Sequence, residues 1–205
     1  MSTRLTVPIA EIDVRALRIG DQVLLTGVIF TGRDAAHKYM QETFIAGPCP
    51  AGERAVYETL KQGLARGVIY HCGPVVKKRA DGKYEFVAAG PTTSIREEPY
   101  EAAVIEHFGL RAVIGKGGMG AKTAAACQKF GAVYLHAIGG AATLIAESVK
   151  EVVAVHKLDF GVPEAFWQIR VVDFPCVVTM DARGQSLHEK VRADSQCKLA
   201  ELIGQ

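Results

Sequence analysis

A run of six residues containing four glycines, 115–120, constrains this chain more than any other feature of its sequence. It follows a short apolar segment, 112–114, that is typical of a buried strand, and it precedes an expected helix at 121–130. A second strand is expected at 132–135. Strands that alternate with helices in this way are typical of an α/β protein with parallel strands. The expected fold class is therefore α/β, with a mixed sheet core and flanking helices.

The rest of the chain adds further strands, some of them antiparallel. Residues 22–30 are apolar on both faces, as in a buried strand, and the strand at 83–89 is expected to form a hairpin with the strand at 68–71. The closing helix is expected to be amphipathic, with Leu187, Val191, Leu199 and Leu202 on its apolar side. The remaining expected elements are strands at 4–8, 152–155, 167–172 and 176–179, and helices at 35–44, 52–66, 97–108, 141–148 and 186–202.

The composition is that of an ordinary globular protein with one core. The chain has 205 residues, of which 49% are hydrophobic and 22% are charged, and its net charge is +2. A single domain covering residues 1–205 is expected. The one basic cluster, Lys77-Lys78-Arg79 with Lys83, surrounds an expected turn, so it predicts a solvated hairpin tip and no nucleic-acid partner. No segment predicts a leader or a membrane span, and a cytoplasmic protein without a membrane partner is expected.

The cysteines predict neither a disulfide framework nor a metal site within this chain. There are five of them, no two are closer than 21 residues, and no CxxC pair occurs. Five buried or half-buried thiols are expected instead. The expected number of metal ligands in this chain is therefore none, and a metal that takes part in the function has to come from elsewhere.

The glycine-rich run predicts a site for an anion. Lys116 stands at the end of a strand, and Gly117 and Gly118 leave backbone N–H groups uncovered before a helix begins. A cation together with free amides binds a carboxylate or a phosphate. The alternative is a tight turn that needs glycine for a positive φ, with Lys116 in solvent.

Two nucleotide-binding motifs were tested against the same run. Gly115, Gly117 and Gly120 fit the G-x-G-x-x-G spacing of a dinucleotide site, but no acidic residue ends the next strand, which closes on 134–137. A phosphate-binding P-loop does not fit either, because Ala121 separates the last glycine from the next lysine. A dinucleotide-binding oxidoreductase therefore rests on the glycine spacing alone.

Two further loops carry cations and hydroxyl groups. In the loop 90–96, Thr92 and Thr93 offer hydroxyls and Arg96 offers a planar fork that matches a carboxylate. The alternative is a helix cap, in which Thr93 or Ser94 bonds the first turn of the next helix.

The other loop, 31–37, begins after the strand 22–30. There Asp34 is expected to orient Arg33 or to cap the following helix, and His37 is expected to be packed or on the surface. If Arg33, Arg96 and Lys116 converge, they suit a small substrate with two carboxylates.

Taken together, these segments resemble the β subunit, or C-terminal domain, of class I fumarase and L-tartrate dehydratase, the iron-sulfur hydro-lyases. The resemblance covers about residues 20 to 180. It is carried by the following segments, in family order: Leu25-Thr26-Gly27, Thr31-Gly32-Arg33-Asp34-Ala35-Ala36-His37, Gly73-Pro74, Gly90-Pro91-Thr92-Thr93-Ser94-x-Arg96, Gly115-Lys116-Gly117-Gly118-Met119, Ile138-Gly139-Gly140-Ala141-Ala142, and Phe160 to Trp167.

The resemblance implies a swivelling β/β/α fold and a mainly helical α partner. That partner holds a [4Fe-4S] cluster through three cysteines, and the open iron acts as a Lewis acid on the substrate hydroxyl. An α2β2 assembly is implied as well. Carried onto this sequence, the resemblance implies that Arg33, Arg96, Lys116, Thr93 and Gly117 bind the substrate. It implies that Thr92 is the catalytic base, which takes a proton from the carbon next to a carboxylate.

Within the family, the sequence favours fumarase, which interconverts S-malate and fumarate. The segment Tyr134-Leu135-x-Ala137-Ile138-Gly139-Gly140 and the intact Gly32-Arg33-Asp34-x-Ala36-His37 resemble the fumarase branch. L-tartrate dehydratase is the alternative, followed by a related hydratase such as one acting on mesaconate. A non-catalytic dicarboxylate-binding domain also stays open.

Overall fold

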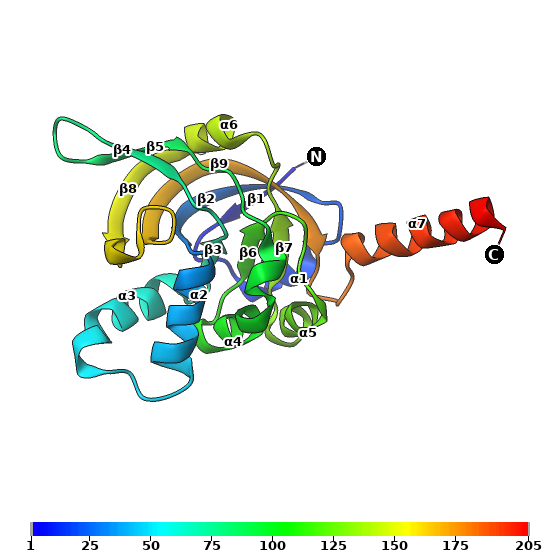
Figure 1. Ribbon diagram of the computed structural model, residues 1–205, viewed down its shortest axis with the longest axis horizontal. Coiled ribbons are helices and arrows are strands. Elements are labelled where there is room, and N and C mark those ends of the chain that lie inside the picture. Colours follow the sequence, from blue (N-terminus) through cyan, green and yellow to red (C-terminus); the bar gives the residue numbers. More distant parts are fainter. Residues whose placement is uncertain (1, 205) are drawn as a thin grey trace.

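Parallel strands form the centre of the structure, a computed structural model that describes residues 2–204 (Figure 1). β2, β3, β6 and β7 lie side by side in that order, and β1 runs parallel to the first half of β2. The bounds of these strands are β1 Thr3–Thr6, β2 Gln22–Thr31, β3 Val68–Tyr70, β6 Ala112–Gly115 and β7 Val133–His136. Mixed α/β architecture with a mixed sheet is confirmed.

The long strand β9 (Phe166–Met180) closes the sheet on itself. It pairs antiparallel with β2 through residues 168–177, with β7 through residues 177–180, and with β8 (Val149–His156) on its outer side. The prediction of two separate strands at 167–172 and 176–179 is wrong. Asp173 takes a left-handed φ of +51° and its amide donates to Thr26 Oγ1 at 3.0 Å. The residues between the two predicted strands are therefore an irregularity within the single strand β9.

The predicted hairpin between 68–71 and 83–89 is also wrong. β3 lies between β2 and β6, where all three of its residues are buried, and β5 (Tyr84–Ala88) pairs with β4 (Val75–Lys78). Burying three apolar residues between two parallel strands stabilises the fold more than placing them in an exposed hairpin would. Asp81 and Gly82 do form the turn of the β4–β5 hairpin, and the basic cluster lies exposed around it, as predicted.

The helices lie on two sides of the closed sheet. In Figure 1, α2, α3, α4 and α5 lie together on one side, and α6 lies with the β4–β5 hairpin on the other. Short helical turns extend several of the helices. The bounds are α1 Glu11–Ala16, α2 Asp34–Met40, η1 Gln41–Ile45, η2 Ala51–Glu53, α3 Arg54–Leu64, η3 Ser94–Glu97, α4 Glu98–Phe108, α5 Ala121–Phe130, α6 Ala142–Ser148, η4 Leu158–Phe160 and α7 Leu187–Ile203.

Side chains that alternate along the central strands separate two apolar clusters. Val68 and Tyr70 of β3 belong to the cluster inside the closed sheet, which also holds Trp167, whereas Ile69 belongs to the cluster under the helices. The alternation follows from the period of two in a strand. Both faces of the central strands are thus buried, and the ends of those strands remain free to carry polar side chains.

The last helix, α7, does not close the domain as predicted. It extends away from the body in Figure 1, and none of its residues is buried. Val191, Leu199 and Leu202 are 56%, 56% and 75% exposed. Of the four apolar residues predicted there, only Leu187, at the start of the helix beside β9, is partly buried, so most of the apolar side that the sequence predicted is exposed. Among the helices of those residues, none is both long and apolar enough to cross a membrane.

Candidate active site

Each segment that carries a predicted cation begins where a parallel strand ends or lies beside such an end. Arg33 follows β2, His71 follows β3 and Lys116 follows β6. Because the strands are parallel, these positions share one edge of the sheet, which is where α/β proteins bind ligands. The third loop, with Thr93, pairs with Lys116 in a short parallel bridge. The structure therefore brings the three predicted loops together.

The two arginines lie on either side of one carboxylate. Asp34 Oδ2 is 2.8 Å from Arg96 Nη2 and 3.7 Å from Arg33 Nη2. On its other side, Arg33 Nε is 3.4 Å from Glu164 Oε1. Gly73 makes room for this arrangement, since a Cβ there would lie 2.4 Å from Arg33 Nη1. Asp34 thus orients both arginines, which the sequence suggested for Arg33 alone.

Lys116 lies against the threonine loop through its backbone. Its amide donates to the Thr92 carbonyl at 3.2 Å, and its carbonyl accepts from the Ser94 amide at 3.0 Å. Within residues 2–204, no carboxylate lies within 4 Å of its ammonium group. Thr92 Oγ1 is buried and has no hydrogen-bond partner there. An unpaired cation and an unpaired hydroxyl therefore lie on neighbouring segments.

The glycine-rich run binds no anion through the helix that follows it. The first amides of α5 are occupied by the Glu98 carboxylate, whose Oε2 accepts from the Gly120 amide at 2.7 Å and whose Oε1 accepts from Lys122 at 3.0 Å. The first amides of this helix are therefore satisfied by an internal carboxylate and are not left for a ligand. Gly117 and Gly118 have φ values of +81° and +78°, as a tight turn requires. Gly117 is exposed beside Thr93.

The alternative role of Thr93 or Ser94 as a helix cap is not found. Thr93 precedes η3 without a side-chain bond to it, and the Ser94 hydroxyl faces inward. Ser94 Oγ lies 2.8 Å from His71 Nδ1 and 2.8 Å from the Tyr134 hydroxyl. Ser94 therefore joins the loop to a buried polar network under the site.

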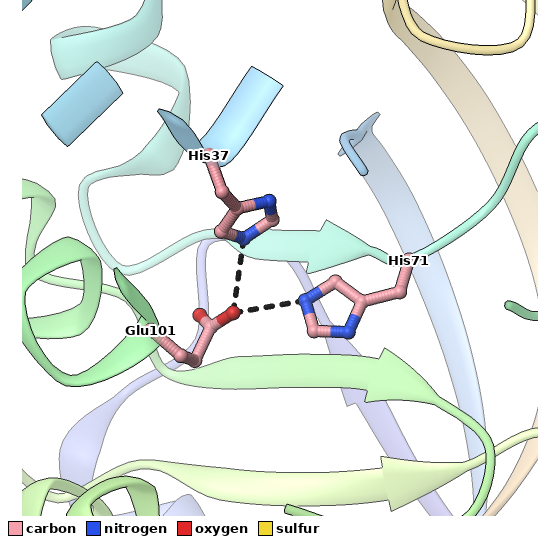
Figure 2. Close-up of side chains that lie close together, drawn as sticks. All are labelled: His37, His71 and Glu101. Carbon is pink, nitrogen blue, oxygen red and sulfur yellow. Dashed lines mark hydrogen bonds and ion pairs between the residues drawn. The ribbon is translucent and has the colours of Figure 1, made fainter. Parts of the chain in front are cut away.

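Two histidines and one glutamate form the centre of that network (Figure 2). Glu101 Oε2 lies 2.9 Å from His37 Nε2 and 2.9 Å from His71 Nε2. All three side chains are completely buried. His37 comes from α2, His71 from the end of β3 and Glu101 from α4, so the network joins elements that are far apart in sequence. His37 is packed, as predicted.

The network changes the protonation of its members. Burial opposes charge on His37, but the carboxylate of Glu101 outweighs burial and raises the pKa of His37 above its ordinary value. Burial would raise the pKa of Glu101, but the charge of His37 and the bonds from both imidazoles outweigh it and hold that pKa at about 2. Glu97, which is buried nearby without a partner for either carboxylate oxygen, has a pKa raised by burial.

His71, Glu97 and Glu101 were not predicted as site residues from the sequence. A signal was present in the helix predicted at 97–108, because Glu97 and Glu101 share the helical spacing of Val104 and Phe108, which are buried. A charged residue on an apolar stripe needs a buried partner. The partner itself, His71, follows a strand and has no local pattern that distinguishes it.

The donor set of this chain does not fit an iron-sulfur cluster. Among residues 2–204, the only group of three or more potential metal ligands is His37, His71 and Glu101, and it contains no cysteine. Cys72, Cys127 and Cys176 are buried, and burial raises the pKa of each thiol, which disfavours the thiolate that a cluster needs.

The fold and the site define a mixed α/β domain with three cationic side chains at the carboxyl edge of its parallel strands. The model of the family "Fumarase C-terminus" matches residues 2–191. The chain belongs to this family, which confirms the resemblance found in the sequence.

Curated relatives of two kinds match nearly the whole chain. A "Putative fumarate hydratase class I" of Geobacillus stearothermophilus is 48% identical over 96% of this chain, which spans 35% of that relative's length. The "L(+)-tartrate dehydratase subunit beta" of Escherichia coli is 38% identical over 99% of this chain and 96% of its own. A "Putative L(+)-tartrate dehydratase subunit beta" of Methanocaldococcus jannaschii is 41% identical over 94% of both chains.

Proposed function

We propose that this chain is the β component of a hydro-lyase that interconverts S-malate and fumarate. The observation that carries the proposal is the meeting of Arg33, Arg96 and Lys116 at one edge of the sheet, in a member of the Fumarase C-terminus family. A substrate with two carboxylates presents two anionic ends, which suit two arginines at one end and a lysine at the other. The 48% identity to a protein named for fumarate hydratase supports this substrate.

The cations have a catalytic as well as a binding role in this proposal. Removing a proton from the carbon next to a carboxylate puts negative charge onto that carboxylate. Lys116, which no carboxylate within residues 2–204 neutralises, then stabilises the transition state more than the ground state. Arg33 and Arg96 hold the substrate in place through planar forks. Thr93 and Gly117 line the same segments and contribute contacts to the substrate.

Thr92 is the proposed base. A free hydroxyl is a very weak base, so this role requires positive charge close by. Two observations support the proposal: the Thr92 carbonyl accepts from the backbone amide of Lys116, so the cationic residue is on a neighbouring segment, and Thr92 Oγ1 has no partner within residues 2–204. The hydroxyl therefore has no competing partner among the described residues, but it is buried, so the proposed role requires that it be uncovered when substrate binds.

An iron-sulfur α partner completes the proposed enzyme. The cysteines of this chain offer no cluster ligands together, and relatives of the same length are named as β subunits. The chemistry at the substrate hydroxyl, and the general acid, therefore belong to the partner. An α2β2 assembly is part of the proposal, as is a cytoplasmic location.

L-Tartrate is the second candidate substrate. This chain covers 96% of the length of the Escherichia coli subunit that is named for tartrate dehydratase, whereas it covers 35% of the relative named for fumarate hydratase. The coverage of nearly the whole of a subunit named for tartrate dehydratase supports tartrate, and the higher sequence identity supports malate.

The test is activity after anaerobic reconstitution with an iron-sulfur α chain, with S-malate and L-tartrate offered side by side. Formation of fumarate from S-malate supports the main proposal, and a preference for L-tartrate moves the enzyme to the second candidate. If a formed complex with a loaded cluster turned over neither, the hydro-lyase proposal would fall. A titration of the chain with NAD⁺ separates the oxidoreductase alternative, and binding of dicarboxylates without turnover points to a non-catalytic domain.

A further inference from the structure

A buried network of hydrogen bonds and one ion-pair contact connects the segments that carry the proposed substrate-binding residues. We propose that His37, Glu101, His71, Ser94 and Tyr134 form a positioning network with one fixed proton arrangement, in which His37 is an imidazolium and His71 is neutral with its hydrogen on Nε2. No member is proposed to touch substrate. The network fixes the loops that do.

The proton on His37 follows from its two neighbours. Its Nδ1 lies 2.9 Å from the Arg33 carbonyl, which can only accept, so Nδ1 carries a hydrogen. Its Nε2 lies 2.9 Å from Glu101 Oε2 in an ion-pair contact, although the ring orientation makes no well-aligned hydrogen bond, and a proton on Nε2 supplies the positive charge that this contact requires. With the carboxylate of Glu101 also accepting from His71, that proton is placed on His37, which makes His37 doubly protonated and positively charged.

The tautomer of His71 follows from the hydroxyls on its other side. Tyr134 has one hydroxyl hydrogen, and Ser94 Oγ at 2.8 Å is its acceptor. Ser94 then directs its own hydrogen to His71 Nδ1, also at 2.8 Å. His71 Nδ1 therefore accepts, and the hydrogen of a neutral imidazole is left on Nε2, facing Glu101. The hydrogens of Tyr134, Ser94 and His71 each have an acceptor in this arrangement, and the charge on His37 lies against the Glu101 carboxylate.

The same arrangement argues against a metal ion between the three central side chains. A metal needs a lone pair on each ring nitrogen, and both Nε2 atoms carry hydrogens here. The two Nε2 atoms also share one oxygen, each at 2.9 Å, which is an ordinary hydrogen-bond distance. In the proposed arrangement, contacts through hydrogens hold the three side chains together. Zinc bound between them would overturn the proposal.

Each end of the network reaches a substrate-binding segment. His37 bonds the backbone of Arg33, and Ser94 belongs to the loop between Thr92 and Arg96. The His71 carbonyl accepts from the Thr92 amide at 2.8 Å. Gly115, next to Lys116, packs so closely on Ser94 that a Cβ there would lie 1.8 Å from Ser94 Oγ. A shift in the network therefore moves the loops relative to one another.

Other titratable groups face the same centre. Glu97 from η3 is buried beside both histidines, and Asp34 acts on Glu97 from α2. Cys127 from α5 faces Glu101, where burial and the carboxylate both raise the pKa of its thiol. An ionised Glu97 adds to the negative potential of Glu101 at His37, whereas burial disfavours that ionised form, so Glu101 is the main source of negative potential there.

Nuclear magnetic resonance of the full chain labelled with ¹⁵N-histidine tests the proton arrangement directly. In long-range ¹H–¹⁵N correlation spectra at pH 7.5, His37 is expected to show two protonated ring nitrogens and His71 a protonated Nε2 only. The single variants His37→Gln and His71→Gln assign the signals among the six histidines. A neutral His37, a hydrogen on His71 Nδ1, or stoichiometric zinc by metal analysis with metal-shifted Nε2 signals would each overturn the proposal.

The positioning role is tested with Ser94→Ala in the reconstituted complex, and this part rests on the proposed function. The variant removes the link between His71 and Tyr134 and adds no bulk. We expect kcat to fall by roughly 10-fold or more, because small misplacements of binding groups cost this much, with KM changed by much less. The matched control is Ser148→Ala, whose buried hydroxyl bonds only the Ile145 carbonyl at 2.6 Å on α6 and is expected to leave kcat unchanged.

Two results separate the possible failures. A folded Ser94→Ala chain with unchanged kcat would show a purely structural network. A wild-type complex that turns over neither S-malate nor L-tartrate would remove the proposed function, and the histidine spectra would still decide on the proton arrangement.

Discussion

Lys116 directly follows the buried strand β6. Within residues 2–204, no carboxylate neutralises its ammonium group. An uncompensated cation at a half-buried position is costly unless an anionic ligand completes it. The arginines differ, since Asp34 lies within 4 Å of both. At the scale of single residues, the lysine is therefore the group whose charge is most available to a substrate.

Lys116→Ala is accordingly expected to lower kcat/KM of the reconstituted enzyme by about 10²- to 10³-fold, the usual cost of removing one group that stabilises a developing negative charge. Steady-state kinetics with S-malate and L-tartrate measures this. The matched control is Lys122→Ala, because Lys122 is exposed on α5. Near-normal turnover by a folded Lys116→Ala enzyme would remove Lys116 from the site.

Arg96→Lys keeps the charge and removes the planar fork. A lysine supplies a single ammonium group, which cannot bond Asp34 and a carboxylate through two parallel bonds. We expect kcat/KM to fall at least tenfold, with most of the loss in KM. Arg192→Lys on α7 is the control, and equal activities of the two variants would contradict the role of the fork.

At the scale of elements, Glu98 determines whether the helix that follows the glycine-rich run can bind an anion. Its carboxylate accepts from the amides of Gly120, Lys122 and Thr123, and from the Thr123 hydroxyl at 2.6 Å. It thus acts as the cap of α5 and also ties α5 to the first turn of α4. The first turn of α5 therefore contributes to the stability of the fold. Lys116, which precedes it, remains available to bind an anionic ligand.

Glu98→Ala is expected to destabilise the chain by about 1–2 kcal/mol, the usual cost of a lost helix cap. In a chain of this size that lowers Tm by roughly 2–8 °C, which differential scanning calorimetry resolves. Glu106→Ala serves as the control, because Glu106 is also on α4 but is exposed, and its ion pair is with the exposed Lys129 (Glu106 Oε1 to Lys129 Nζ, 3.8 Å). A Tm equal to that of the control would mean that the amides of α5 are satisfied otherwise.

The elements also show where sequence patterns suffice. The strand, glycine run and helix around Lys116 were predicted because each depends on neighbouring residues. The partner of β3, the continuity of β9 and the exposure of α7 were missed because each depends on what a distant segment does. A three-residue strand such as β3 carries too short a pattern to name its neighbours.

The same division applies to the site. Arg33, Arg96 and Lys116 each lie in or beside a recognisable glycine-marked loop, so their side chains could be chosen from the sequence. Arg33 and Lys116 share an edge because β2 and β6 are parallel, whereas the loop of Arg96 is brought there by the bridge between Thr93 and Lys116. The network below them could not be derived in this way. Glu101 gave a local signal as a charge on an apolar stripe, but the distance to His71 comes only from the packing of α4 against β3.

For the whole molecule, the network makes stability depend on pH in two directions. Folding raises the pKa of His37, so the stability it contributes is complete below its ordinary pKa of about 6.5 and is lost as the pH rises through the raised value. Folding lowers the pKa of Glu101 to about 2, so its contribution is complete above the ordinary value of 4.5 and is lost as the pH falls toward 2. Between these limits the ion pair is intact.

The difference in Tm between the wild-type chain and His37→Gln is therefore expected to be larger at pH 6 than at pH 10. His107→Gln is the matched control, because burial lowers the pKa of His107, so its neutral form is favoured by folding and its pH dependence has the opposite sign. Thermal unfolding of the three chains across this range measures both effects. Because His37, His71 and Glu101 join α2, β3 and α4, a Tm difference that did not change with pH would mean that these elements are held together without the proton on His37.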